Sequence, residues 1–163
     1  MNGPIFEREL WSCARPVRPM TEWCTAYCGV EEVHVIDHIS VPVADLGRSA
    51  TFYDAVLATL RLWRRKERPG AIGYGPMARP APVFWILDRA RDGAANAGIG
   101  LHISFTAPDR SSVDDFYSTA LRHGGIDAGA PGMRPQYTMP FYGAFIIDPD
   151  GFKIEAVCRT PDE

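Results

Sequence analysis

An internal repeat is the feature of this sequence that most restricts its fold. The tripeptide His38-Ile39-Ser40 recurs as His102-Ile103-Ser104, and the pair Phe52-Tyr53 recurs as Phe116-Tyr117, both at a spacing of 64 residues. Matches at one fixed spacing indicate two copies of one supersecondary unit. Each copy must therefore supply the same elements in the same order.

Hydrophobic periodicity predicts the elements of both copies. In the first copy we expect a strand, a helix and three further strands, over 35–43, 47–60, 61–67, 71–75 and 83–87. In the second copy we expect the same order, over 101–107, 111–123, 126–129, 141–147 and 152–158. Each copy is therefore a βαβββ module, and the fold class is α+β.

The two modules occupy only part of the chain. We expect them at about 33–88 and 99–159, which gives one domain over 33–159 and a tail at 160–163. Residues 1–32 contain three prolines and show no hydrophobic period, so we expect an N-terminal extension with little packed structure. Three of the four cysteines lie in it, namely Cys13, Cys24 and Cys28. This uneven placement favours free thiols in a reducing cytosol over a disulfide framework.

Composition and charge exclude several classes of protein. The chain has 163 residues, 46% of them hydrophobic and 23% charged, with a net charge of -3. No apolar run is long enough for a membrane span, and the net charge shows no general basic excess. We expect no secretory signal in the first 32 residues, because they lack a basic region followed by an apolar one. A basic cluster at 61–68 lies on a predicted edge strand, where charge commonly prevents aggregation. We expect a cytoplasmic protein with a small-molecule substrate, and neither a nucleic-acid nor a membrane partner.

Side-chain alternation places three metal-binding residues on one kind of strand face. His38, His102 and Glu155 each fall on the face opposite to the apolar residues that must meet the helices. Two imidazoles and one carboxylate are the ligands of a facial metal site with open positions. A single strand His or Glu more often has a structural or solvated role. The equivalence of the two histidines in the repeat favours a site for Fe, Mn, Ni or Zn.

Three segments of the sequence resemble a known superfamily. They are IDHISVPVADLGRSATFYDAVLATL, LHISFTAP and FIIDPDGFKIEAV, and they resemble the vicinal oxygen chelate superfamily of glyoxalase I, extradiol dioxygenases, and fosfomycin- and bleomycin-resistance proteins. The resemblance implies paired βαβββ modules in an incompletely closed eight-stranded barrel around a divalent metal. It places His38, His102 and Glu155 at the metal-ligand positions. It also implies a homodimer, with the ligands of one site drawn from one chain or from two.

One position departs from glyoxalase I. Enzymes of that type carry a further Glu or Gln on the last strand of the first module, where this chain has Trp85. An indole does not ligate a hard divalent metal, so three protein ligands remain, as in the dioxygenase and fosfomycin-resistance branches. We interpret Trp85 as a wall against which an apolar or aromatic substrate packs. An ordinary core position is the alternative.

The second module is longer than the first by six residues around Ala130–Pro140, which we interpret as a loop that borders the site. Arg134 is a candidate for binding a substrate carboxylate or phosphate. Tyr137 is a candidate hydrogen-bond donor or catalytic acid, and Tyr142 a candidate substrate contact. A solvated Arg and packing tyrosines are the structural alternatives.

The leading hypothesis is a metal-dependent enzyme that binds two vicinal oxygens of a small substrate, as a lyase or isomerase or as a ring-cleaving dioxygenase. Glu155 is then a ligand and a candidate catalytic base. The alternative is a metal-free drug-binding protein of the bleomycin-resistance type, with a groove lined by Trp85, Tyr137 and Phe141. The sequence leaves open the metal, the substrate and a role for glutathione.

Overall fold

The computed structural model describes residues 36–88, 101–137 and 140–161. The predicted extension and its three cysteines lie outside the described residues, as does most of the segment between the modules. Ile36–Glu163 forms one compact unit. Within the described residues, neither helix has the length and apolar character that crossing a membrane requires.

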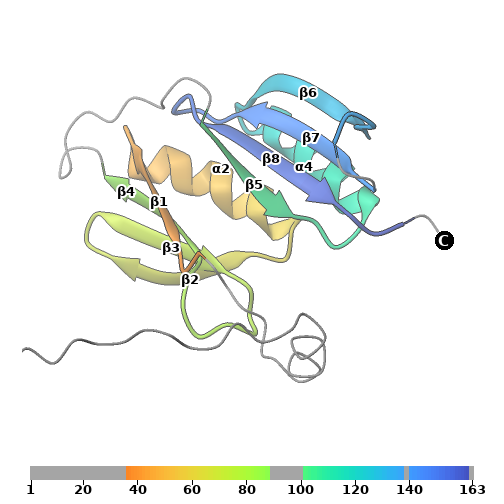
Figure 1. The fold of residues 1–163 in the computed structure, drawn as a ribbon. Helices are drawn as coiled ribbons and strands as arrows, with labels where there is room; N and C mark the ends of the chain where they lie inside the picture. Colours follow the sequence, from red (N-terminus) through yellow and green to blue (C-terminus); the bar gives the residue numbers. More distant parts are fainter. Residues whose placement is uncertain (1–35, 89–100, 138–139, 162–163) are drawn as a thin grey trace, which may run out of the picture. The chain divides into compact units, whose positions relative to one another are not determined.

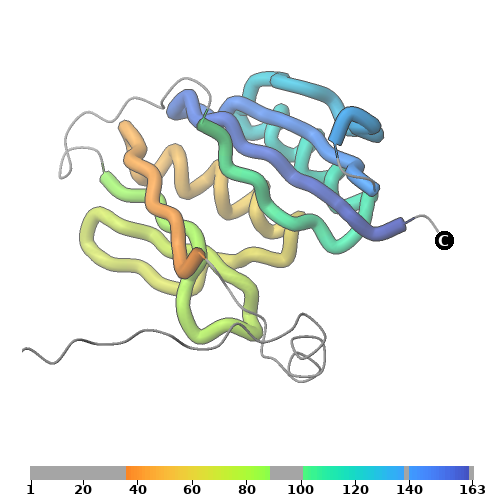
Figure 2. The backbone as a smooth tube through the Cα atoms, in the orientation of Figure 1, coloured from red at the N-terminus to blue at the C-terminus, as the bar shows by residue number. Residues whose placement is uncertain are grey.

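Both predicted modules are present, each with the order βαβββ (Figure 1). The first contains β1 (Ile39–Val43), α2 (Leu46–Ala58), β2 (Trp63–Arg68), β3 (Ala71–Gly75) and β4 (Phe84–Asp88). The second contains β5 (His102–Thr106), α4 (Arg110–Arg122), β6 (Ile126–Met133), β7 (Tyr142–Ile147) and β8 (Lys153–Cys158). The repeat in the sequence is therefore a repeat of structure, and the backbone trace follows the two modules one after the other along the chain (Figure 2).

Each module builds one four-stranded sheet. The strand orders are β1-β4-β3-β2 and β5-β8-β7-β6. The first strand of each module runs parallel to the last, and the remaining neighbours are antiparallel. The α+β class is confirmed. The described strands of one chain form two separate sheets, with no strand pairing between them. The predicted eight-stranded barrel is therefore not closed within this chain.

Each helix begins at an aspartate that accepts a hydrogen bond from its first turn. Asp45 accepts from the backbone N–H of Arg48, and Asp109 accepts from that of Ser112. An acceptor at this position satisfies a backbone donor that has no partner inside the helix. Each helix buries one face, which consists mainly of apolar side chains. These include Phe52, Tyr53, Val56, Leu57, Val113, Phe116 and Ala120.

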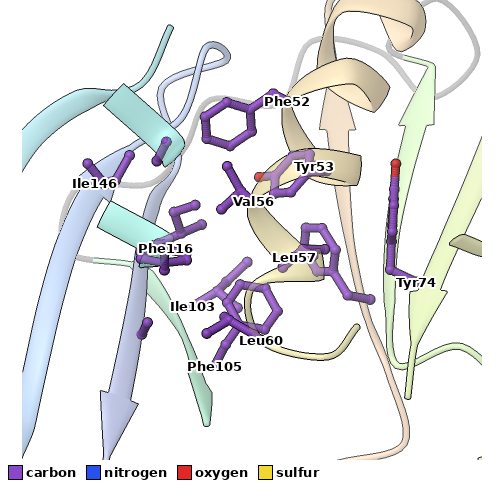
Figure 3. Packing of buried hydrophobic residues seen from close by; sticks show 14 of the residues in the cluster. Phe52, Tyr53, Val56, Leu57, Leu60, Tyr74, Ile103, Phe105, Phe116 and Ile146 are labelled. Atoms are coloured by element: carbon purple, nitrogen blue, oxygen red, sulfur yellow. The ribbon is translucent and has the colours of Figure 1, made fainter. Parts of the chain in front are cut away.

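The two helices contact each other and share one hydrophobic core. Figure 3 shows side chains of α2 between those of the second module, such as Phe116 and Ile146, and Tyr74 of the first sheet. The ring centroids of Phe84 and Phe105, one from each module, are 5.3 Å apart. Because the shared core covers the helix-facing side of both sheets, the opposite sides carry the residues that remain open to a ligand.

The turn between β7 and β8 fastens the second module to the start of α2. The Asp150 carboxylate accepts hydrogen bonds from the Ala44 backbone N–H at 2.8 Å, the Arg48 guanidinium at 2.6 Å and the Ser49 hydroxyl. The Asp150 side chain is only 5% exposed. These bonds join residues about a hundred positions apart, so they fix how the two modules pack.

A second carboxylate of the same turn is buried against α2. The Asp148 side chain accepts a hydrogen bond from the Tyr53 hydroxyl and from the backbone N–H groups of Asp150 and Phe152. Burial raises the pKa of Asp148, and burial together with the nearby Asp148 charge raises the pKa of Tyr53. The predicted tight turn thus also serves as a junction between the modules.

Two predicted boundaries are wrong. The first strand was expected over 35–43, but residues 36–38 are not in a strand and β1 begins at Ile39. The extra residues of the second module were expected as a loop, but β6 continues through Met133, with Gly132 paired to Gly143 and Met133 to Tyr142. The register shifts twice along β6. A β-bulge absorbs an additional residue in a strand without ending it, so part of the insertion lengthens the sheet.

Candidate metal centre

The sheet registers make Trp85 and Glu155 equivalent positions of the two modules. Trp85 pairs with Ser40 across β1 and β4, and Glu155 pairs with Ser104 across β5 and β8. Ser40 and Ser104 are themselves equivalent in the repeat. An indole therefore occupies in the first module the place that a carboxylate occupies in the second, as the sequence predicted.

His102 and Glu155 lie together on the helix-distal face of the second sheet. The distance from His102 Nε2 to Glu155 Oε2 is 3.3 Å. The Glu155 side chain is only 3% exposed, and its Oε1 has no hydrogen-bond partner among the described residues. A buried carboxylate oxygen without a donor is costly, and a cation at this place would offset that cost.

The spacing of these two side chains fits a shared metal ion. Ligand atoms about 2.1 Å from one ion are about 3.0 Å apart at a right angle and about 3.4 Å apart at a tetrahedral angle. The observed separation of 3.3 Å lies within this interval. An imidazole nitrogen with a carboxylate oxygen suits Fe, Mn, Ni or Zn, so the residues fit the divalent metal that the sequence predicted.

An aromatic cavity of about 280 Å³ surrounds this pair. Tyr137, Phe141 and Phe145 line it together with His102 and Glu155. The ring centroids of Tyr137 and Phe141 are 4.8 Å apart, and the Tyr137 side chain is partly exposed. The structure thus places Tyr137 in the same cavity as the candidate metal ligands.

The other two candidates of the second module lie differently. The Arg134 guanidinium lies over the Phe145 ring at 5.7 Å and donates to the Ala130 carbonyl. It is therefore in contact with one wall residue of the cavity, Phe145, and is not itself among the lining residues. The Tyr142 hydroxyl instead donates to Asp114 of α4 at 2.8 Å. Tyr142 lies an odd number of residues from Phe145 on β7, which puts it on the helix-facing side, and we leave it out of the proposed substrate site.

His38 lies immediately before β1 of the other sheet, in a cavity of about 430 Å³ that Trp85 also lines. Its Nδ1 is 2.6 Å from the Asp37 carboxylate, and this hydrogen bond lowers the pKa of Asp37. A carboxylate bonded to one ring nitrogen typically orients a histidine whose other nitrogen binds a metal. Asp37 was missed from the sequence, although its position next to His38 was a usable signal.

The predicted triad is thus divided into two half-sites in one chain. Within the described ranges, no group of three His, Cys, Asp or Glu side chains lies close enough to hold a metal ion. His102 and Glu155 form one half-site, whereas His38 forms the other with Trp85. We call them the His102 half-site and the His38 half-site.

The Trp85 ring lies against a glycine of the neighbouring strand. A Cβ atom built on Gly73 would come within 2.9 Å of the Trp85 ring and 2.8 Å of Pro82. Such contacts are too short for real side chains, so Gly73 provides the space in which the indole sits. The Arg68 guanidinium covers the ring at 5.5 Å.

Substitution of Gly73 by Ala is expected to displace the Trp85 ring. The crowding should lower the free energy of unfolding by about 1–3 kcal/mol and change the tryptophan fluorescence spectrum. Thermal unfolding and fluorescence measure both effects. The matched control is Gly47→Ala in α2, where the added Cβ would meet only Asp45 Oδ1 at an ordinary 3.5 Å. Equal behaviour of the two variants would contradict the prediction.

Comparison with known proteins finds similarity over the same region. A family model of the Glyoxalase/Bleomycin resistance protein/Dioxygenase superfamily matches residues 35–156. The chain is 29% identical over 130 residues to the lactoylglutathione lyase of Escherichia coli O157:H7, covering 74% of this chain and 89% of that protein. It is 32% identical over 133 residues to a probable lactoylglutathione lyase of Synechocystis sp., covering 74% and 92%.

The solved structures agree with this similarity. A glyoxalase/bleomycin resistance protein from Albidiferax ferrireducens has a TM-score of 0.68 and 31% sequence identity to this chain, covering 78% of this chain and 100% of its own. The family match includes nearly all of both βαβββ modules. This chain belongs to the glyoxalase/bleomycin resistance protein/dioxygenase superfamily.

Proposed function

We propose that this protein is a metal-dependent lyase of the glyoxalase type, which acts on a small substrate with two vicinal oxygens. The observation that carries the proposal is the buried Glu155 carboxylate, whose Oε1 lacks a hydrogen-bond partner in the described part of the chain, beside His102. The lyase class is supported by the names of the relatives from Escherichia coli and Synechocystis.

The complete site requires a second copy of the chain. His38 and His102 occupy two different cavities, and their side chains are 50% and 46% exposed. In a two-fold dimer, the His38 half-site of one chain faces the His102 half-site of the other, and symmetry forms the same composite site twice. This arrangement would also bring two four-stranded sheets together as the expected barrel. The proposal is therefore a homodimer with two composite sites.

Each residue of the composite site has a chemical role. His38, His102 and Glu155 would hold the divalent metal, which when bound polarises a substrate carbonyl as a Lewis acid. The Glu155 carboxylate accepts a proton from the carbon next to that carbonyl, because Oε1 is buried without a competing donor in the described residues. The Tyr137 hydroxyl donates a hydrogen bond to a substrate oxygen at the cavity mouth. Trp85 packs against the apolar part.

Alanine substitution of His38, His102 or Glu155 is expected to lower metal affinity at least about 100-fold, because losing a direct ligand costs no less than losing its outer partner. Elemental analysis of the purified variants measures the metal content. His123→Ala is the control, since the His123 ring is bonded to the Thr119 carbonyl at the end of α4. Full metal content in all three ligand variants would overturn the site assignment.

The reaction class has its own test. We expect the metal-loaded protein to convert thiol hemiacetals of 2-oxoaldehydes, and not to cleave catechols. Oxygen-dependent catechol cleavage with bound Fe(II) would assign a dioxygenase instead. Protein that is purified without metal, gains no activity from added metal and binds an aromatic drug would support the metal-free alternative.

A further inference from the structure

We propose that the His38 half-site also contains a binding subsite for an oxyanion of the substrate, a carboxylate or a phosphate, formed by Lys66 and Arg68. The inference deepens the proposed function and rests on it in one respect, namely that the substrate enters this cavity. Both cations line the same cavity of about 430 Å³ as His38 and Trp85.

The sheet register places Lys66 on the face that carries Trp85. Lys66 pairs with Gly73, Gly73 pairs with Trp85, and Trp85 pairs with Ser40. Residues paired across strands point to the same side of a sheet, and so does Arg68, two positions beyond Lys66. The sequence pattern indicated that the basic residues of this strand protect a sheet edge against aggregation. That explanation does not account for Lys66 and Arg68, because their side chains face the cavity.

The other face of the same strand shows how a cation is neutralised here. Arg64 forms ion pairs with Asp54 of α2 at 2.5 Å and with Glu67 at 3.2 Å. Within the described residues, the ion pairs include neither Lys66 nor Arg68. Two neighbouring cations without a carboxylate partner in a cavity make a favourable place for a substrate anion.

Two further side chains define what the subsite recognises. The Arg68 guanidinium lies over the Trp85 ring at 5.5 Å, an arrangement that holds the planar cation and leaves its edge free for two parallel bonds to an oxyanion. Asp37 is the carboxylate that lines the same cavity, and it is bonded to His38. The two cations at the Lys66 end therefore attract the anion to that end of the cavity.

The order of the strands gives the direction in which the substrate extends. His38 precedes β1 at one edge, and Lys66 and Arg68 belong to β2 at the other, with β4 and β3 between them. The Arg68 side chain reaches back across β3 to the Trp85 ring of β4. The substrate thus carries its vicinal oxygens toward His38 and its oxyanion toward Lys66 and Arg68, with its apolar part near Trp85.

Calorimetric titration of the purified dimer tests this subsite without using activity. The probes are 3-phenylpropanoate, its neutral amide and 2-phenylethyl phosphate. Lys66→Gln and Arg68→Gln are each expected to weaken the binding of at least one of the two anions about tenfold or more and to leave the amide unchanged. Arg64→Gln, on the opposite face of the strand, is the matched control and should bind all probes as the original protein does.

The outcomes separate this proposal from the proposed function. If the original protein binds one anion more tightly than the other, that anion identifies the substrate's oxyanion as a carboxylate or a phosphate. This assignment requires that both Gln variants bind the anion no more tightly than the amide. Equal binding of all three probes by the original protein, or anion binding that neither Gln variant weakens, overturns the subsite whatever the metal content. Charge-dependent binding by a protein that takes up no metal would keep the subsite and overturn the metal-dependent function.

Discussion

Co-expression of His38→Ala and Glu155→Ala chains is expected to restore metal binding that neither variant shows alone. Each homodimer lacks one ligand in both composite sites. In the mixed dimer, one site loses both ligands, whereas the other takes the intact His38 of one chain and the intact Glu155 of the other. Random assembly makes about half of the dimers mixed, so we expect about one quarter of the original metal content and activity. Elemental analysis and activity assays of the co-expressed protein measure this recovery.

The same experiment distinguishes a site between chains from a site within one chain. A within-chain site leaves no intact triad in any dimer, and recovery is then zero. The matched control combines His102→Ala with Glu155→Ala, because both residues belong to the His102 half-site. In that mixture each site contains a defective His102 half-site, and no recovery is expected. Recovery in the control pair would show that the proposed division of ligands is wrong.

Removal of the Asp150 carboxylate is expected to cause a large loss of stability at a position away from the site. Asp150→Ala leaves the buried Ser49 hydroxyl, the Ala44 N–H and the Arg48 guanidinium without their acceptor. A hydrogen bond to a charged group is worth about 1.5–3 kcal/mol, and a buried polar group left without a partner costs about 1–3 kcal/mol. We expect a decrease of about 3 kcal/mol in the free energy of unfolding and of about 10 °C in Tm.

Denaturant and thermal unfolding measure this loss, and an exposed aspartate supplies the comparison. Asp115 lies on the outer face of α4, and Asp115→Ala is expected to change the free energy of unfolding by no more than about 0.5 kcal/mol. A Tm for Asp150→Ala equal to that of the Asp115 variant would show that the turn between β7 and β8 does not hold the modules together.

The sequence predicted the modules because local pattern and repeat agreed. The strict alternation of His102, Ser104 and Thr106 against Ile103 and Phe105 determined which face of β5 is buried. The equivalence of Trp85 and Glu155 followed from the resemblance to glyoxalase I, and the strand registers agree with it. The face of a regular strand on which a side chain lies is predictable, because successive side chains point to opposite faces. This alternation does not depend on what packs against the sheet.

Features that depend on distant contacts were not predictable. The bonds of Asp150 join turn and helix across the core, and the turn motif alone indicated only a chain reversal. The direction of Tyr142 toward Asp114 depends on where β7 begins after the insertion. The lack of a complete triad in the described part of one chain likewise depends on how the sheets pack, which the ligand pattern of each strand does not contain.

The register equivalence of Trp85 and Glu155 has a consequence for the orientation of a bound substrate. Two half-sites with identical residues would give a composite site with internal symmetry, and a substrate would fit it in two opposite orientations. An indole in one half and a carboxylate in the other remove that symmetry, so the proton acceptor lies on a single side of the substrate. We therefore expect the proposed site to bind its substrate in one orientation, and the difference between these two equivalent positions is the structural cause.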